Sequence, residues 1–395
     1  MPGPGAGAAH AVTTSDVVCL GESMVTFLPS QPGRLADVPS FGRAIGGAES
    51  NVACALAAAG HRAKWVGRVG ADGFGDHLVE AISAYGVDTS AVRRDTARPT
   101  GIYFRTAADR ATDTHEVAYY RAGSAASAMS PANVPAGDVL RGRILHLSGI
   151  TAALSEDCLS LLHFLTAPRP GRPLISFDVN YRPGLWRGGE AGPQVLLDLA
   201  RRADLVFVGE DEAEEAWGLC GADAIRAALP EPSLLVVKRG SEGATVFSRP
   251  GPEPRSSTAG RAETAGSDAP VREGTDRGQA PDAAVATRDT VTTVPALRVD
   301  VVAAVGAGDA FAAGFLSATL RDLPVRERTR HGHLMAAGVL TVPGDLTAPP
   351  SRAHADRLVA LDDDAWGRLR LGPGWTAAGQ APVTRTPVTQ EVHPT

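Results

Sequence analysis

Residues 300–315 read DVVAAVGAGDAFAAGF, in which two glycines and an aspartate separate an apolar run from a run of helix-forming residues. Gly306 and Gly308 permit backbone conformations that a side chain would forbid, and they allow a ligand to approach the main chain closely. Asp309 opens a predicted helix, where free N–H groups and the positive end of the helix dipole attract an anion. The carboxylate there could simply cap the helix, or it could accept a proton from an attacking hydroxyl group.

Short apolar runs alternate with amphipathic or Ala-rich stretches through most of the chain. Seven runs are predicted to be buried strands, namely residues 16–21, 62–70, 143–149, 173–180, 203–210, 233–240 and 297–306. Strands that alternate with helices form right-handed βαβ units, in which helices cover both faces of a parallel sheet. The pattern therefore predicts an α/β fold.

Two segments, within residues 24–45 and 98–123, lack a helical period and contain Thr, Tyr and Phe in alternation. We expect them to form short antiparallel strands of an accessory sheet. Such a sheet would lie as a lid over the strand ends, where open α/β folds bind their ligands. Its exposed edges favour a homo-oligomer, because a partner subunit commonly covers such edges.

Composition excludes several classes of function. The 395 residues are 44% hydrophobic and carry a formal net charge of −6, which argues against a nucleic-acid or membrane-surface partner. The four cysteines form no C-x-x-C pair, so we expect them to be reduced and mostly buried. No signal-peptide pattern and no membrane-spanning apolar run is present, which predicts a cytoplasmic protein.

One large domain is predicted over residues 16–366, because the rest of the chain has little to bury. Residues 1–15 are rich in Gly, Ala and Pro and are predicted to be a flexible tail. Residues 249–294 are predicted to be a disordered insertion between two strands, and residues 367–395 a second flexible tail.

Residues 306–315, GAGDAFAAGF, resemble the C-terminal signature of the ribokinase-like (PfkB) family of sugar and nucleoside kinases. Residues 44–60, AIGGAESNVACALAAAG, resemble the N-terminal signature of the same family. Either motif alone is weak, but the two in this order and separation are specific. The resemblance implies a three-layer ribokinase-like fold with a mostly parallel central sheet and a small β-sheet lid, and it implies ATP and Mg²⁺ as cofactors.

The resemblance also assigns roles to single residues. It implies that Asp309 is the catalytic base and that an anion hole is formed by Gly306, Ala307 and Gly308. From the N-terminal signature it implies a sugar pocket lined by Gly46, Gly47 and Asn51. Without the resemblance, the N-terminal signature is also explained as a tight turn followed by an Ala-rich buried helix.

On the nucleotide side, the family's N-x-x-E motif matches residues 209–212, with Glu212 as the magnesium-organising acid and Gly209 where Asn is usual. Acids in a first helical turn also simply complement the dipole. Residues 236–247 resemble a strand-turn-strand near the nucleotide, with Lys238, Gly240 and Gly243 at its turn, although they also suit a plain hairpin. Residues 333–345 resemble a helix and turn beside the adenine. Ala303 replaces an acid that usually precedes the anion-hole motif.

Residues 176–186, SFDVNYRPGLW, resemble the 2-keto-3-deoxygluconate kinase branch of the family, as do TGIYFR and YYRAGSAAS. That resemblance implies that the sugar acid is held by Tyr103, Tyr119, Arg121 and Arg182. Tyr119 and Arg121 are two apart and so face one side of a strand. The planar fork of arginine suits a carboxylate, although both arginines could instead form surface ion pairs. Fructose, ribose and 5-dehydro-2-deoxygluconate remain alternative substrates, and a non-catalytic sugar or nucleotide sensor remains an alternative function.

Overall fold

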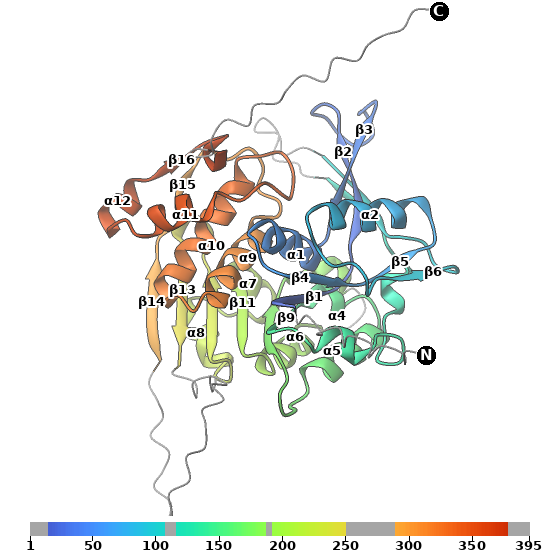
Figure 1. Cartoon of the computed structure of the whole chain (residues 1–395), viewed down its shortest axis with the longest axis horizontal. Coiled ribbons are helices and arrows are strands. Elements are labelled where there is room, and N and C mark those ends of the chain that lie inside the picture. Colours follow the sequence, from blue (N-terminus) through green and yellow to red (C-terminus); the bar gives the residue numbers. More distant parts are fainter. Residues whose placement is uncertain (1–14, 107–115, 187–191, 250–288, 378–395) are drawn as a thin grey trace, which may run out of the picture.

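The computed structural model describes residues 15–106, 116–186, 192–249 and 289–377. An eight-stranded sheet forms its centre (Figure 1), in the order β14-β13-β12-β11-β10-β9-β1-β4. In that order the strands span Thr290–Val294, Ala244–Ser248, Leu234–Lys238, Leu205–Gly209, Leu174–Asp178, Ile144–Ser148, Val17–Leu20 and Ala63–Val66. The six strands from β12 to β4 are parallel, and β13 and β14 join the edge antiparallel. The mostly parallel central sheet is thus confirmed.

Both faces of this sheet are buried. In β1, Val18 and Leu20 belong to one hydrophobic core cluster, whereas Val17 and Cys19 belong to a second cluster on the other face. A strand covered on both sides needs no polar face, which is why the strands read as continuous apolar runs.

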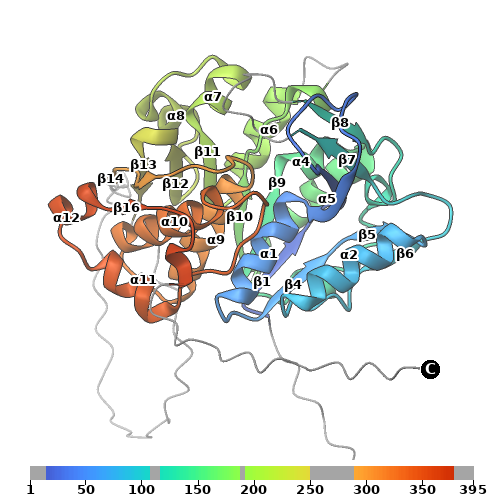
Figure 2. The same ribbon diagram turned by 90° about the horizontal axis from the view of Figure 1, so that it is seen from above.

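Helices form the two outer layers, and Figure 2 shows α6, α7 and α8 on one side of the sheet and α1, α9 and α10 on the other. The longer helices α1, α2, α5, α6, α9 and α10 span Ala48–Ala58, Gly73–Ala84, Glu156–Thr166, Gly192–Arg201, Ala307–Leu320 and Val325–Leu340. The shorter helices α3, α4, α7, α8, α11 and α12 span Ala136–Val139, Gly149–Ala152, Glu210–Trp217, Ala222–Ala228, Arg352–Val359 and Asp363–Arg368. The chain therefore has the three-layer arrangement that its sequence predicts.

The lid is a separate four-stranded sheet in the order β3-β2-β7-β8, whose strands span Phe41–Gly46, Met24–Pro29, Ile102–Arg105 and Val117–Tyr120. It lies within the predicted segments. The expectation of purely antiparallel strands is wrong, because β2 and β7 pair in parallel. The chain leaves the lid after β3, builds α1, β4 and α2, and re-enters in the same direction, as a parallel pair requires.

Two smaller pairings complete the strand inventory of the described residues. Strands β5 and β6, Arg68–Gly70 and Arg93–Asp95, pair in parallel. Strands β15 and β16, Arg298–Val299 and Arg370–Leu371, also pair in parallel. Single 3-10 turns η1, η2, η3 and η4 span Ala126–Ala128, Pro183–Leu185, Gly240–Glu242 and Trp375–Ala377.

The predicted insertion is shorter at its C-terminal end than its composition suggests. Residues 290–294 are not disordered but form β14, which pairs with β13 along its whole length. Asp289, just before it, forms an ion pair of 2.7 Å with Arg226. Strand β14 is at an edge of the sheet, and its residue Val291 is 55% exposed. Since an edge strand buries only part of its surface, it tolerates polar residues and its sequence resembles that of a loop. Residues 250–288 lie outside the described residues.

The predicted C-terminal boundary of the domain at residue 366 is also wrong, because the segment that follows is folded although its sequence resembles that of a loop. Residues 367–377 include the end of α12, β16 and η4, and Trp375 is buried in a third core cluster with Trp366 and Leu371. The predicted tails at residues 1–15 and 367–395 otherwise fall on residues 1–14 and 378–395, which lie outside the described residues.

The strand predicted over residues 297–306 is also mostly absent. Only Arg298–Val299 is a strand, and Val301 and Val302 are exposed at 40% and 43%. This segment pairs with β16 outside the large sheet, and its residues Leu297 and Val299 pack against the third core cluster instead. Cys19, Cys54 and Cys158 are buried free thiols, while Cys220 is exposed. Among the described residues, no helix is long and apolar enough to cross a membrane.

Candidate active site

A cleft of about 930 Å³ opens between the lid and the C-terminal ends of β10, β11 and β12. Its lining comes from the lid, from the start of α1, from the loop after β10 and from the turn into α9. Open α/β folds place their ligand sites at this edge of the sheet, because the strand ends and helix starts converge there.

The turn into α9 lines this cleft through Gly306, Ala307 and Gly308. Gly306 is the N-cap of the helix and has a left-handed φ of 78°. A Cβ atom there would lie 2.7 Å from the carbonyl oxygen of Asp345, so only glycine fits. The first N–H groups of a helix lack intrahelical acceptors, so this turn presents donors to the cleft.

Asp309 lies three residues inside α9, so it does not occupy the N-cap position. Its half-buried carboxylate faces the cleft, and its Oδ2 atom accepts a hydrogen bond of 2.9 Å from Nδ2 of Asn51. Withdrawal from water raises the pKa of Asp309 to about 7, against the lowering effect of the Asn51 hydrogen bond. The nearby carboxylates of Asp178 and Asp345 raise this pKa further, and Lys238 opposes them.

Lys238, the last residue of β12, brings a cation to the same place. Its Nζ atom lies 3.2 Å from both carboxylate oxygens of Asp178, at the end of β10. Burial alone would lower the pKa of the Lys238 ammonium, but the adjacent acids Asp178 and Glu212 outweigh it and raise that pKa. A Cβ atom on Gly308 would lie 3.6 Å from Nζ, so this amine stands beside the turn into α9. An ammonium beside free N–H groups forms an anion-binding corner.

The lid contributes an aromatic and basic wall. Tyr103 on β7 and Tyr119 on β8 are register partners, and their ring centroids lie 5.4 Å apart. Arg121 lies with its guanidinium 5.7 Å from the Tyr119 ring, which confirms that these two side chains face the same side. Arg121 also forms an ion pair with the buried Glu22, yet its buried Nε atom has no hydrogen-bond partner among the described residues.

The N-terminal signature reaches the cleft as well. Gly47 and Asn51 line it, and Gly46 stands so close to Tyr103 that a Cβ atom would collide with the phenol oxygen. At Gly47, a Cβ atom would lie 2.5 Å from the carbonyl oxygen of Glu22. The double glycine therefore brings the start of α1 into contact with the lid, and the helix that follows is buried as its Ala-rich sequence suggests.

A model of the pfkB family of carbohydrate kinases matches residues 14–263 and 279–352. The chain belongs to this family. The 2-dehydro-3-deoxygluconokinase of Bacillus subtilis (strain 168) is 32% identical over 85% of this chain and 93% of the relative. The probable fructokinase-6, chloroplastic, of Arabidopsis thaliana is 28% identical over 85% of this chain and 80% of the relative. A crystal structure of a PfkB protein from Polaromonas sp. JS666 is 31% identical, with a TM-score of 0.68 over 87% of this chain and 99% of that one.

Within this pfkB-family fold, Glu212 and Arg182 meet at the mouth of the cleft. Glu212 accepts a hydrogen bond of 2.9 Å from the N–H of Gly209 at Oε2, and Arg182 donates one of 3.3 Å to Oε1. Glu212 thus complements the start of α7, and the exposed Arg182 is in an ion pair. The described residues contain no group of three or more His, Cys, Asp or Glu side chains arranged for a metal. A protein cage for Mg²⁺ does not fit, whereas one carboxylate beside nucleotide phosphates and water does.

The structure does not bring Gly240 and Gly243 to the cleft lining. Both have positive φ angles, 52° and 123°, in the turn between β12 and β13. A Cβ atom on Gly243 would collide with the carbonyl oxygen of Val294 on β14. The plain hairpin interpretation therefore accounts for these two glycines, and only Lys238 from that motif lines the cleft.

The polar side chains of Asp178, Asn180 and Asp345 also line the cleft, although the predicted site residues did not include them. Asp178 is the last residue of β10, and Asn180, two residues beyond it, is buried with a positive φ of 42°. A non-glycine residue in that conformation is strained, which is common at ligand sites. Asp345, the last residue of the predicted adenine-side string, is buried and lines the same cleft. A lone acid after a helix carries no sequence signal, because only its tertiary neighbours distinguish it.

Proposed function

We propose that this chain is an ATP-dependent sugar kinase that transfers the γ-phosphoryl group to a terminal hydroxyl of a sugar acid, most favourably 2-keto-3-deoxygluconate. The observation that carries the proposal is the position of Asp309, whose carboxylate faces the cleft beside the amino end of α9 and the ammonium of Lys238. The site thus combines a base, Asp309, with the anion-binding corner formed by the start of α9 and Lys238.

In the proposed reaction, the sugar hydroxyl attacks the γ-phosphorus while its proton passes to Asp309. A new O–P bond forms, and the bond between the γ-phosphorus and the β-phosphate oxygen breaks. A base with a pKa of about 7 suits this task near neutral pH, because it is substantially ionised and still a useful proton acceptor. The N–H groups of Ala307 and Gly308 and the Lys238 ammonium would stabilise the charge on the transferring group.

Magnesium, when bound with ATP, neutralises phosphate charge. Glu212 is the acid of this chain that would hold it, through water, since its carboxylate lines the cleft.

Arg121 supports an acidic substrate. Its guanidinium lines the cleft 5.7 Å from the Tyr119 ring and so brings a positive charge to the wall where a sugar would bind. Tyr103 and Tyr119 stand beside it and offer hydroxyl groups. A carboxylate on the sugar would pair with this guanidinium. A neutral sugar is the second candidate, and the similarity to a probable fructokinase favours it.

A coupled assay of ADP release over aldonic, keto-deoxy and neutral sugars tests the substrate class. We expect turnover with 2-keto-3-deoxygluconate, and a loss of roughly 10²- to 10⁴-fold in Asp309→Asn. The matched control is Asp364→Asn, an exposed acid on α12. Near-normal turnover in Asp309→Asn would exclude the mechanism, and sugar binding without ATP turnover in the unaltered protein would favour a sensor.

A cytoplasmic homo-oligomer is part of the same proposal. Strand β8 is at an edge of the lid, and its residue Tyr120 is exposed at 65%. Aromatic side chains at a free strand edge favour a partner subunit there. Sedimentation across micromolar concentrations tests this, and a monomer throughout would refute it.

A further inference from the structure

A buried ion pair joins the lid to the segment that follows α10. Nη2 of Arg105, the last residue of β7, lies 2.6 Å from Oδ1 of Asp345, and each side chain is only 5% exposed. The hydroxyl of Tyr103, on the same strand, donates to Oδ2 of Asp345 at 3.4 Å. One carboxylate outside the lid thus binds two side chains of a lid strand.

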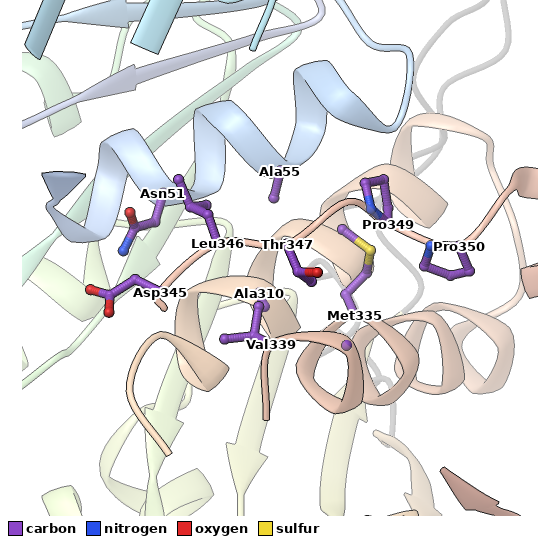
Figure 3. A pocket seen from close by; sticks show the side chains of 11 residues that line it. Asn51, Ala55, Ala310, Met335, Val339, Asp345, Leu346, Thr347, Pro349 and Pro350 are labelled. Carbon is purple, nitrogen blue, oxygen red and sulfur yellow. The ribbon is translucent and has the colours of Figure 1, made fainter. Parts of the chain in front are cut away.

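The backbone of Asp345 contacts the turn into α9, on the side of the cleft away from the lid. A Cβ atom on Gly306 would lie 2.7 Å from the Asp345 carbonyl oxygen and 3.0 Å from its Cα atom. The turn into α9 and residue 345 are therefore in direct main-chain contact, which requires glycine at 306. Figure 3 shows Asp345 and Asn51 at the same end of a small pocket that also reaches Ala310 on α9.

Stability alone is a poor explanation for this pair. Burying two charges costs about as much as their attraction returns, and apolar residues of similar volume are often equally stable. The Nε atom of Arg105 is buried without a hydrogen-bond partner among the described residues, so the pair is also incompletely satisfied. A buried charge pair that spans two structural units instead specifies one relative arrangement of those units.

We propose that Asp345 and Arg105 are positioning residues that couple the lid over the sugar to the phosphate-binding turn at Gly306. When the lid is in place, its strand β7 holds the Asp345 side chain, and the Asp345 backbone then supports the turn. When the turn binds phosphate, the same contacts favour the closed lid. The inference rests on the proposed kinase function and deepens it, because each substrate then prepares the site for the other.

Hydrogen exchange of lid peptides with a non-hydrolysable ATP analogue and Mg²⁺ alone tests the coupling without a sugar, because the analogue carries the γ-phosphoryl group that the turn at Gly306 would bind. In the unaltered protein, we expect nucleotide to slow amide exchange in β7 and β2. In Arg105→Met and Asp345→Asn, nucleotide still binds, and the slowing in the lid is lost. Arg105→Lys, which keeps the charge, retains part of it. Arg34→Met is the matched control, since Arg34 pairs with Asp37 on the exposed part of the lid segment.

A binding measurement gives the magnitude. We expect 2-keto-3-deoxygluconate to tighten binding of the non-hydrolysable ATP analogue by roughly 5- to 150-fold in the unaltered protein, and by a factor close to one in Arg105→Met. The inference is overturned if nucleotide does not slow amide exchange in the lid of the unaltered protein. It is also overturned if nucleotide still slows that exchange in folded Arg105→Met and Asp345→Asn. If no sugar in the panel is phosphorylated, the proposed function fails while the exchange measurement still decides the coupling.

Discussion

Nδ2 of Asn51 on α1 donates a hydrogen bond of 2.9 Å to Oδ2 of Asp309 on α9, across 258 residues of sequence. The two family signatures therefore meet at one carboxylate. The bond holds one oxygen of the Asp309 carboxylate, which lines the cleft.

Asn51→Ala should shift the pH dependence of turnover. A hydrogen bond to the ionised form lowers the pKa of Asp309, so its loss raises that pKa, and the acidic limb of the pH–rate profile moves to higher pH. The charged groups that face Asp309 are Asp178, Asp345 and Lys238, and this variant leaves them unchanged. We expect the largest loss of rate below pH 7. Gln194→Ala on the exposed face of α6 is the control, and an unmoved profile in Asn51→Ala would contradict the assignment.

Asp309→Asn should stabilise the protein at alkaline pH. The pKa of Asp309 is raised in the folded state, so the folded protein binds more protons than the unfolded chain between about pH 4 and pH 7. Stability is therefore lost as the pH rises through this window, and the full penalty is present above it. Removing the charge removes the penalty, so we expect a higher Tm than that of the unaltered protein at pH 8 and little difference at pH 4. The reverse order would mean that the carboxylate is not desolvated.

Lys238→Met separates charge pairing from catalysis. It leaves Asp178 buried without its cation, and such a loss is typically strongly destabilising. We expect the double variant Lys238→Met, Asp178→Asn to recover much of the unfolding free energy but not the turnover, because no cation remains beside the turn into α9. Urea unfolding and ADP release together measure both effects. Recovery of turnover in the double variant would show that Lys238 only balances Asp178.

Gly306→Ala should disrupt the contact with Asp345. Gly218 offers a matched control, because its φ of 64° is also left-handed and a Cβ atom there meets nothing within 4 Å. Both substitutions carry the left-handed penalty of about 1–2 kcal/mol. The collision with the Asp345 main chain adds about 1–3 kcal/mol at Gly306 alone. Equal unfolding free energies for the two variants would place Asp345 farther from the turn.

Arg121→Met should distinguish acidic from neutral sugars. Loss of the fork that would bond a carboxylate raises the KM for 2-keto-3-deoxygluconate, which we expect to exceed tenfold for a charge-assisted pair of about 1.5–3 kcal/mol. The KM of any neutral sugar in the panel should change little. Steady-state kinetics on both substrates check this, with Arg43→Met on lid strand β3 as the control. An equal rise for both sugars would assign Arg121 a structural role through Glu22.

Local patterns determined much of the fold. The apolar runs at 16–21 and 203–210 are strands of the central sheet, since a buried parallel strand needs a continuous apolar sequence that composition reveals directly. The same reading failed at 290–294 and 367–377. An edge strand and a terminal segment bury only part of their surface, so their sequences resemble those of loops.

The amino-acid sequence by itself determined most of the buried strands, the glycine turn at residues 306–308 and the carboxylate that follows it, because glycine patterns and apolar periodicity are local properties. Only the tertiary structure decided that Asp345 contacts both Arg105 and Gly306, that Lys238 pairs with Asp178, and that Gly240 and Gly243 stay outside the cleft. Those relationships join residues far apart in the chain, and no periodicity within one segment encodes a contact that arises when separate layers pack together.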